Sequence, residues 1–442
     1  MVFPESVLSC IDALECRGFQ AWAVGGCVRD WLLGIEPHDF DLCTDASPEQ
    51  MQEVFSGDSL VLAGLKHGTL GVIRDGEVVE ITTFRTEGNY ADGRHPDWVR
   101  FVTDIRQDLA RRDFTVNAMA YSPARGLMDP FGGADDLKNG VLRCVGEPEQ
   151  RFREDALRIL RGARFAARFR FAVEENTWQA MLSQAHLMEH LARERVFEEL
   201  SRLLPAVDAE HLCRLGPVLA RVIPELEPML GFQQHSPHHR HDVFTHTAWV
   251  VQRVPEDVTV RFAALLHDVG KPGCFTRDAN GRGHFKGHDK LGAAMADEIL
   301  ARLRAPTRLR EEAVWLISHH MLRFPAEAKS VRRQLSRYGK ERLLALLALQ
   351  RADLLGKDAE PIDKELSHLD EIKALIESLT EREGVITART LALTGRDLMA
   401  LGYAPGPGMG RLLEQLREAV LDEKVKNDRE DLLNFISCHK FD

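Results

Sequence analysis

The chain has 442 residues, of which 44% are hydrophobic and 28% are charged, and its net charge is −11. This length exceeds the size at which a single hydrophobic core stops growing, so we expect several domains. No apolar run approaches the ~18 residues that a membrane span needs, and the N-terminus has no basic stretch leading into an apolar core. We therefore predict a cytoplasmic protein without a membrane span. The eight cysteines are scattered without a Cys-X-X-Cys pair, which favours reduced thiols.

The negative net charge argues against a nucleic-acid partner only if it is spread evenly, and it is not. Residues 143–170 carry eight arginines and four acidic residues. A basic face of this kind can hold RNA, with strong salt dependence as the consequence. The alternative is a solvated helix face laced with ion pairs between neighbouring turns. The charge pattern alone leaves both interpretations open.

Short apolar strands alternate with helical stretches in the first part of the chain. Residues 1–20 predict a helix that ends at Gly18. The predicted strands are Ala21–Val24, Phe40–Cys43, Leu70–Ile73 and Val78–Thr82. This pattern predicts a small mixed sheet flanked by helices, and the turn-rich residues 129–133 close it.

A glycine pair and a carboxylate pair are the most informative features of this part. Gly25 and Gly26 let backbone N–H groups approach a phosphate closely, because no Cβ is in the way. Asp39 and Asp41 alternate in a predicted strand and therefore share a face. A cation stabilises such a pair, and Mg²⁺ prefers these ligands together with phosphates. The alternative is a solvated Asp-X-Asp at a strand edge. Glu80, in another predicted strand, is a weaker candidate for a third carboxylate.

Helical spacing dominates from residue 146 to the end of the chain. Glu154–Arg168 and Thr177–Leu204 show it most clearly. Asp155 and Arg158 are three residues apart, so we expect them on one face of the first of these helices. An ordinary ion pair within the helix is the alternative role. Residues 231–242 indicate a linker into a second catalytic unit, and residues 403–408 indicate a loop between tail helices.

The second unit carries histidines and aspartates in an order that fits a metal site. The candidate ligands are His246, His267, Asp268, His288, His320 and Asp353. Imidazole and carboxylate together suit Mn²⁺, Fe²⁺, Co²⁺ or Ni²⁺, and such a metal activates water against a phosphoester. His284 and His319 are weaker candidates. The His241-Asp242 doublet lacks the Gly-Lys-Pro that follows Asp268, so we expect it to lie outside the site. The alternative is a set of histidines that merely decorate loops.

Five motifs follow one another between residues 25 and 158. They are Gly25-Gly26-X-X-Arg29-Asp30 with Asp39-X-Asp41, Thr83-Phe84-Arg85-X-Glu87-Gly88, Arg94-His95-Pro96, Arg111-Arg112-Asp113-Phe114-Thr115-X-Asn117-Ala118, and Glu154-Asp155-X-X-Arg158. This series resembles the head domain of class II tRNA nucleotidyltransferases, the CCA-adding enzymes, and of bacterial poly(A) polymerases. The histidine and aspartate set resembles that of HD-superfamily phosphohydrolases. Thr394-Gly395-Arg396-Asp397 and the residues after it resemble the tRNA-gripping body of these enzymes.

The resemblance implies a multidomain α+β fold. A polymerase-β-like nucleotidyltransferase head with a mixed sheet is expected at residues 1–145. All-α neck, HD and body/tail domains are expected at residues 146–230, 231–365 and 366–442. The loop of residues 84–101 looks intact, which favours an enzyme able to add a terminal A.

The resemblance also implies residue roles. Gly25, Gly26 and Arg29 are expected to hold the triphosphate of the nucleotide. Two Mg²⁺ ions would be held by the carboxylate pair Asp39 and Asp41. The remaining nucleotide-binding candidates contact ribose, phosphates or, for Asp155 and Arg158, the Watson–Crick edge of CTP or ATP. These candidates are Arg112, Asp113, Asn117, Asp155, Arg158 and Arg161.

The sequence therefore predicts template-independent addition of CCA to tRNA from CTP and ATP, with a second phosphohydrolase site that takes a transition metal. Addition of the terminal A only, and poly(A) synthesis, remain open alternatives. So do a chain that is chiefly a phosphohydrolase and a non-catalytic RNA-binding module. The second site's substrate stays open between a 2′,3′-cyclic phosphate, a 3′-phosphate and a free nucleotide, as does the oligomeric state.

Overall fold

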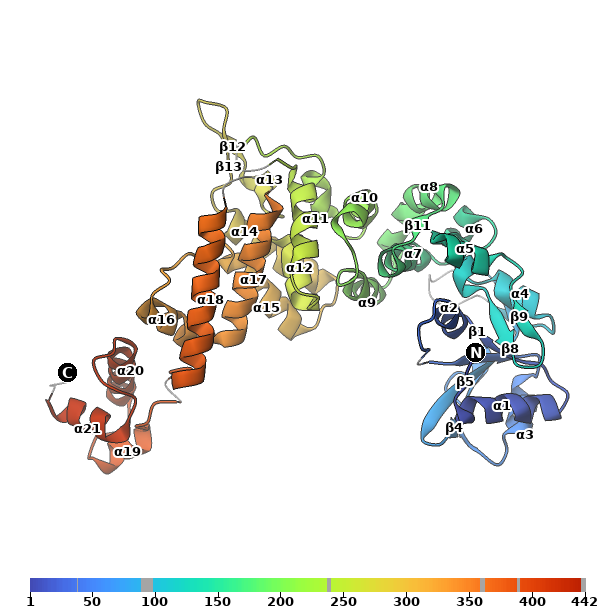
Figure 1. The fold of residues 1–442 in the computed structure, drawn as a ribbon, viewed down its shortest axis with the longest axis horizontal. Helices are drawn as coiled ribbons and strands as arrows, with labels where there is room; N and C mark the ends of the chain where they lie inside the picture. Colours follow the sequence, from blue (N-terminus) through green and yellow to red (C-terminus); the bar gives the residue numbers. More distant parts are fainter. Residues whose placement is uncertain (38, 89–97, 237–239, 358–361, 388–389, 439–442) are drawn as a thin grey trace. The chain divides into compact units, whose positions relative to one another are not determined.

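The computed structural model describes residues 1–37, 39–88, 98–236, 240–357, 362–387 and 390–438. The chain divides into two compact units, which we call the N-terminal and the C-terminal unit. They comprise Met1–Val207 with Leu215–Pro224, and Asp208–Arg214 with Glu225–Asp442. A seven-stranded sheet lies in the N-terminal unit, and helices dominate the C-terminal unit (Figure 1). The finer division at residues 145, 230 and 365 stays a prediction.

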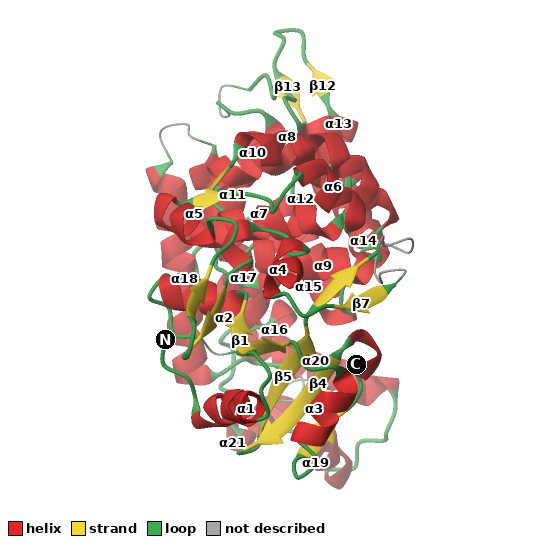
Figure 2. Cartoon of the chain, turned by 90° about the vertical axis from the view of Figure 1, so that its right-hand side faces the viewer, coloured by secondary structure: helices red, strands yellow, loops and turns green. Residues whose placement is uncertain are grey.

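The sheet is mixed, with the strand order β3-β4-β5-β2-β1-β8-β9. Its strands are β1 (Ala21–Val24), β2 (Asp41–Thr44), β3 (Ser59–Val61), β4 (Thr69–Arg74), β5 (Glu77–Thr83), β8 (Ala120–Ser122) and β9 (Gly126–Met128). Only β2 and β5 run parallel, and the other neighbours in this sheet are antiparallel. Figure 2 draws the strands in yellow. The parallel register places Asp41 beside Glu80.

Helices α1 (Glu5–Cys16) and α3 (Pro48–Val54) pack against the sheet and against each other. Helix α2 (Gly26–Leu32) begins two residues after β1 ends. One core of the unit lies where Trp22 and Val24 of β1 meet Phe84, Ile105 and Leu109. This apolar packing fixes the strand from which the glycine pair emerges.

The rest of the N-terminal unit consists of short strands and helices. They are η1 (Leu65–His67), β6 (Arg85–Glu87), β7 (Val99–Phe101), α4 (Ile105–Ala110), η2 (Thr115–Asn117), α5 (Gly133–Asn139), β10 (Val141–Leu142), α6 (Pro148–Glu154), α7 (Leu157–Phe169), β11 (Ala172–Val173), α8 (Glu175–Gln184), η3 (Ala185–His190) and α9 (Arg193–Leu203). Helix α7 packs against α9, and α6 against α8.

The remaining elements begin with α10 (Ala209–Leu219), which contains the division between the two units. The others are η4 (Pro224–Met229), α11 (Val243–Arg253), α12 (Val258–Leu266), α13 (Lys271–Cys274), β12 (Thr276–Arg277), β13 (Gly283–His284), α14 (His288–Arg302), α15 (Thr307–His319), α16 (Ala328–Tyr338), α17 (Lys340–Gly356), α18 (Asp363–Glu383), α19 (Gly395–Ala400), α20 (Pro407–Leu421) and α21 (Arg429–Cys438). Helix α17 packs against α11, α12, α15, α16 and α18. The C-terminal helices α19, α20 and α21 enclose a separate apolar cluster, whose members include Leu398, Leu416 and Leu432.

Capping residues fix where several helices begin. Ser47 and Gln50 form a capping box at the start of α3, in which each side chain bonds the backbone N–H of the other residue. Asp242 accepts the N–H groups of Phe244 and Thr245 at the start of α11. Its carboxylate therefore serves a helix terminus, which agrees with the expectation that this doublet lies outside the metal site.

Within the described ranges, no helix joins the length to the apolar character that crossing a bilayer requires. All eight cysteines are free thiols, and four of them are buried.

The four predicted strands are confirmed, with bounds that differ by a residue at most from those of β1, β2, β4 and β5. The continuous helix expected over Glu154–Arg168 is wrong, because α6 ends at Glu154 and α7 begins at Leu157. Similarly, η3 and two further residues, Leu191 and Ala192, separate α8 from α9 within the expected helix at Thr177–Leu204. The expected loop at residues 84–101 contains paired strands, β6 and β7, at its two ends. Its residues 89–97 lie outside the described ranges.

Candidate functional site

The glycine pair forms the sharp turn between β1 and α2. Gly25 has a φ of +78°, a conformation that strains any residue with a Cβ. A Cβ on Gly25 would lie 2.8 Å from Nη1 of Arg112, which is closer than the two atoms can approach. The turn therefore needs glycine for its backbone conformation, and a Cβ at this position would move the Arg112 guanidinium.

This turn opens on a polar cavity of 420 Å³ in the N-terminal unit. Nine arginines and three aspartates line the cavity. The nine predicted nucleotide-binding residues all belong to its lining, namely Gly25, Gly26, Arg29, Arg112, Asp113, Asn117, Asp155, Arg158 and Arg161. Asp41 lies in the same wall. Such an excess of guanidinium groups around one cavity suits a polyanion such as a triphosphate.

A chain of hydrogen bonds fixes the floor of this cavity. Arg29, which is only 5% exposed, donates to Oδ1 of Asn117 at 2.6 Å and to Asp30 at 2.8 Å. Asn117 in turn donates to Oδ1 of Asp113 at 3.1 Å, and Arg161 pairs with the other oxygen of Asp113 at 2.7 Å. Burial lowers the pKa of Arg29, although Asp30 opposes the change. An anion in the cavity would restore the stability of this partly desolvated cation.

The hydrogen-bond and ion-pair partners of Asp113 lower the pKa of its carboxyl group. Burial raises this pKa, but the Arg161 guanidinium and the Asn117 amide outweigh burial and hold it at about 2. We therefore expect Asp113→Asn to lower the free energy of unfolding at pH 7 by about 2 kcal/mol. The folded-state pKa is the lower one, so this stability is present above pH ~4 and is lost as the pH falls toward the folded-state pKa.

Urea titrations at pH 7 and at pH 3 measure this effect. The difference between wild type and Asp113→Asn should be complete at pH 7 and smaller at pH 3. Asp135→Asn, at an exposed position in the first turn of α5, is the control and should change neither value by more than about 1 kcal/mol. An equal difference at both pH values would contradict the assignment of the stability to the ionised carboxylate.

Asp155 and Arg158 reach the cavity from different local structures. Asp155 has extended backbone (φ −145°, ψ 104°) between α6 and α7, whereas Arg158 lies in the first turn of α7. The expectation that they share one face of a single helix is therefore wrong. Arg158 pairs with Glu154 at 2.8 Å, and Asp155 pairs with Arg195 at 3.2 Å. An ion pair between Asp155 and Arg158 was the alternative to a role in nucleotide binding. This pair does not form in the described part of the chain, where each residue has another partner.

The carboxylate pair lies at the start of β2, a central strand of the sheet, and Asp41 also lines the cavity. Asp39, Asp41, Glu77 and Glu80 line a neighbouring cavity of 590 Å³. Burial raises the pKa of Asp41, Asp39 raises it further, and Arg112 opposes both. Carboxylate oxygens are the ligands that Mg²⁺ prefers, so the pair of Asp39 and Asp41 fits such an ion. The register of β2 and β5 places Glu80 next to Asp41, which supports it as a third carboxylate.

Gly25 offers a test of the turn. We expect Gly25→Ala to raise the KM for the nucleotide roughly tenfold, which corresponds to about 1.4 kcal/mol of lost binding. The reason is that the new methyl group strains the backbone and displaces Arg112. Steady-state kinetics measures the effect. Gly57→Ala is the matched control, because a Cβ there meets no atom within 4 Å; an equal KM for both variants would contradict the interpretation.

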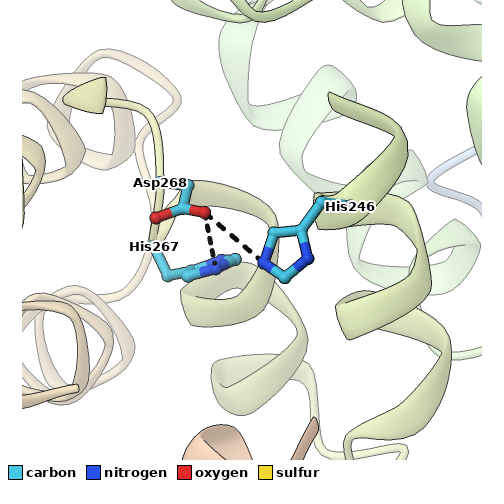
Figure 3. A group of neighbouring side chains, drawn as sticks. All are labelled: His246, His267 and Asp268. Atoms are coloured by element: carbon cyan, nitrogen blue, oxygen red, sulfur yellow. Dashed lines mark ion pairs between the residues drawn. The ribbon is translucent and has the colours of Figure 1, made fainter. Parts of the chain in front are cut away.

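The C-terminal unit brings all six predicted metal ligands together. His246 comes from α11, His267 and Asp268 follow the end of α12, His288 opens α14, His320 follows α15, and Asp353 lies on α17. The ligand atoms form two groups of three. Within each group all three atoms lie within 4.8 Å of one another, and Asp268 belongs to both groups. The groups are His246 with His267 and Asp268, and Asp268 with His288 and His320. Figure 3 shows the first group, with both imidazoles turned toward the carboxylate.

The hydrogen bonds of three histidines decide which ring nitrogen faces the centre. Nδ1 of His267, His288 and His320 lies 2.7–2.8 Å from the backbone oxygens of Ala264, Phe285 and Ile317. A carbonyl oxygen only accepts, so each Nδ1 carries the proton and each neutral Nε2 carries a lone pair. These lone pairs point at one another or at a carboxylate.

These contacts become favourable only when a proton or a metal cation lies between the ligand atoms. Nε2 of His288 lies 3.1 Å from Nε2 of His320, and Nε2 of His267 lies 3.1 Å from Oδ2 of Asp268. Burial lowers the pKa of His267, but Asp268 outweighs it, so the net pKa is raised. The centre thus favours a positive charge between its ligands, and imidazole with carboxylate is a donor set for a transition metal. The residues present therefore fit a metal ion at each of the two groups, which share Asp268.

Two weaker histidine candidates lie outside the cluster, and one lysine that was not predicted contacts it. His284 lies outside the cluster and pairs with Asp278 at 3.0 Å, while His319 stacks on Trp315. Lys271 was not predicted to take part, yet its buried ammonium lies 2.7 Å from Oδ2 of Asp268 and 2.8 Å from the amide oxygen of Gln234. Its position directly after the His-Asp-Val-Gly segment was the available signal.

Comparisons with known families agree with this fold. Residues 21–143 match the family described as "Poly A polymerase head domain". Residues 170–230 match "Probable RNA and SrmB- binding site of polymerase A", and residues 289–436 match "tRNA nucleotidyltransferase domain 2 putative". Together with the cavity and the carboxylates, these matches define the class of the protein as a nucleotidyltransferase.

Whole-chain relatives narrow this class. A CCA-adding enzyme of Streptococcus thermophilus is 32% identical over 442 residues, covering 99% of this chain and 97% of the relative. One of Lactococcus lactis is also 32% identical and covers 96% of both chains. The crystal structure of the Bacillus stearothermophilus CCA-adding enzyme in complex with CTP has a TM-score of 0.75 and 28% identity, and covers 99% and 98% of the two chains. The chain belongs to the family of CCA-adding enzymes.

Proposed function

We propose that this protein adds the terminal CCA to tRNA, using CTP and ATP, without a nucleic-acid template. The observation that carries the proposal is the single cavity in which all nine predicted nucleotide-binding residues meet Asp41. The family of the chain and the CTP bound to the Bacillus stearothermophilus relative support it. We place this activity in the cytoplasm, where tRNA and both nucleotides are found.

The residues of the cavity divide the work. Arg29 and Arg112 hold the triphosphate beside the glycine turn, where Gly25 and Gly26 leave room for its oxygens. Asp39 and Asp41, with Glu80 beside them, would hold the divalent cations of the reaction. When bound, two Mg²⁺ ions make the 3′-hydroxyl of the tRNA a better nucleophile and stabilise the leaving pyrophosphate.

Base choice falls to Asp155 and Arg158. A carboxylate accepts from the exocyclic amine that cytosine and adenine share, and a guanidinium donates to ring nitrogen or carbonyl oxygen. Arg158 is held for this task by Glu154 and by the backbone oxygens of Arg151 and Arg111. Uracil and guanine carry a carbonyl where the amine is needed, so the carboxylate repels them.

Primer extension tests the proposal. The protein is incubated with Mg²⁺ and a tRNA that ends at the discriminator base, with CTP and ATP separately and together. Growth by three nucleotides that then stops supports CCA addition. Growth only on tRNA ending in CC would show an A-adding enzyme, and continued growth with ATP would show a poly(A) polymerase. No growth on any tRNA end would overturn the assignment.

The histidine–aspartate cluster of the C-terminal unit supports a second activity. We assign to it a metal-dependent phosphohydrolase of the HD type, with Mn²⁺, Fe²⁺, Co²⁺ or Ni²⁺ as the metal and an RNA 3′ end or a nucleotide as substrate. The lone pairs of His288 and His320, which face each other at 3.1 Å, are the observation that favours it. When bound, such metals supply a hydroxide for attack on phosphorus.

A further inference from the structure

Helix α9 holds the base-reading carboxylate through Arg195, which itself lines the cavity. Asp155 lies in the extended link between α6 and α7, where no helix of its own holds its side chain. Its Oδ1 accepts the N–H of Leu157 at 3.0 Å, and its Oδ2 accepts from Nη2 of Arg195 at 3.2 Å. Arg195 is the tie between this carboxylate and an element beyond the link.

A second ion pair fixes α9 against α7. Glu199 lies four residues after Arg195, so both residues share one face of α9. Glu199 pairs with Arg164 of α7 at 2.6 Å, and both side chains are buried. Figure 1 shows α7 and α9 side by side, and the two helices are in contact. A buried pair of this kind specifies position, because any shift along the helix would leave two charges unpaired.

The Arg195–Asp155 pair and the Glu199–Arg164 pair place their charges in opposite order across the contact with α9. In one pair α9 supplies the cation, and in the other it supplies the anion. A slide of one helical turn would bring Arg195 toward Arg164, which like charges oppose. Helix α9 is thereby locked at the register that holds Arg195 against Asp155. The pair between Arg202 and Glu198 on the same helix is largely exposed and fixes nothing of this kind.

We infer that Arg195 is a positioning residue that sets nucleotide selectivity through Asp155. The inference rests on the proposed function, in which Asp155 reads the exocyclic amine. A fixed carboxylate oxygen repels the carbonyl that UTP presents in place of that amine. Once Arg195 is lost, the carboxylate can turn away from the carbonyl, so UTP is accepted more readily. CTP loses less, because its amine attracts the carboxylate back.

The test compares CTP with UTP on a tRNA that lacks CCA. The ratio of kcat/KM for CTP to kcat/KM for UTP should fall roughly tenfold or more in Arg195→Ala. Arg195→Lys should recover part of it, because an ammonium still binds the carboxylate but without the fixed geometry of a guanidinium. In an Asp155→Ala background, Arg195→Ala should leave the ratio unchanged, since the group through which it acts is gone.

Controls keep the test decisive. Arg202→Ala removes an arginine from the same helix and should leave both the ratio and CTP addition unchanged. Thermal unfolding identifies loss of fold, and Arg195→Lys then carries the comparison. An equal loss for CTP and UTP, an unchanged ratio, or a further change in the Asp155→Ala background would each overturn the inference. A wild-type protein that adds neither nucleotide would overturn the proposed function itself.

Discussion

Asp41→Asn will reduce nucleotide addition by a factor of about 10³ or more, which corresponds to about 4 kcal/mol in the activation barrier. Asp41 lies in the wall of the arginine-lined cavity and also in the neighbouring cavity with Asp39 and Glu80. It therefore connects the triphosphate side of the site with the carboxylate side. Asparagine has almost the same shape but no charge, so the loss reports on cation binding rather than on packing. Single-turnover extension of a tRNA lacking CCA measures it.

A matched control lies four residues further along the same segment. Asp45 bonds the backbone N–H and the amide of Gln20 and has no place in either cavity. Asp45→Asn should keep addition within about twofold of wild type, apart from the small stability loss that one hydrogen bond explains. Comparable rates for Asp41→Asn and wild type would overturn the assignment of the transfer site. Unchanged nucleotide affinity with a lost rate would place the effect in the chemical step.

The glycine and carboxylate motifs could be found from the sequence because their chemistry is local. Gly25 and Gly26 act through one turn, and Asp39 and Asp41 act through the alternation of one strand. The proximity of Glu80 was only a weak expectation. It depends on the parallel pairing of β2 with β5, and strand pairing between distant segments leaves no mark in either segment alone.

The supports of the cavity could not be predicted for the same reason. Arg195 is 40 residues from Asp155, and Glu199 is 35 residues from Arg164. Each of these residues, seen alone, is an ordinary charged residue in a helical pattern. The break at Asp155 was missed because Glu154 and Leu157 both fit helical spacing. The two helices on either side of the break have different partners, since α6 packs against α8 and α7 against α9.

The histidine–aspartate cluster of the C-terminal unit differs in this respect. Its residues come from five separate places in the chain, yet their order and spacing singled out the six that converge. The geometry adds what order could not, namely that Asp268 belongs to both groups and that Lys271 pairs with it. Burial raises the pKa of Asp268, but His267 and Lys271 outweigh it and hold it well below its usual range. The carboxylate is therefore ionised and ready to bind a cation at neutral pH.

Asp268→Asn should lower the affinity of the C-terminal unit for Mn²⁺, Co²⁺ or Ni²⁺ roughly 100-fold or more, because both ligand groups lose their shared charge. The metal stabilises the folded state of the wild type by mass action, so added metal should raise the wild-type unfolding temperature and leave that of the variant unchanged. Metal analysis after dialysis and thermal unfolding with and without metal measure the two effects. Phosphodiesterase activity on a 2′,3′-cyclic nucleotide should disappear with the metal.

The same variant separates the two proposed activities. Asp268→Asn should retain CCA addition, and Asp41→Asn should retain metal binding by the histidine cluster. His284→Ala is the matched control, because this exposed histidine pairs with Asp278 outside the cluster. If His284→Ala and Asp268→Asn lost metal alike, the ions would be binding to surface histidines. If Asp268→Asn bound metal as wild type does, the buried cluster would be a set of hydrogen-bonded core residues and the second activity would fall.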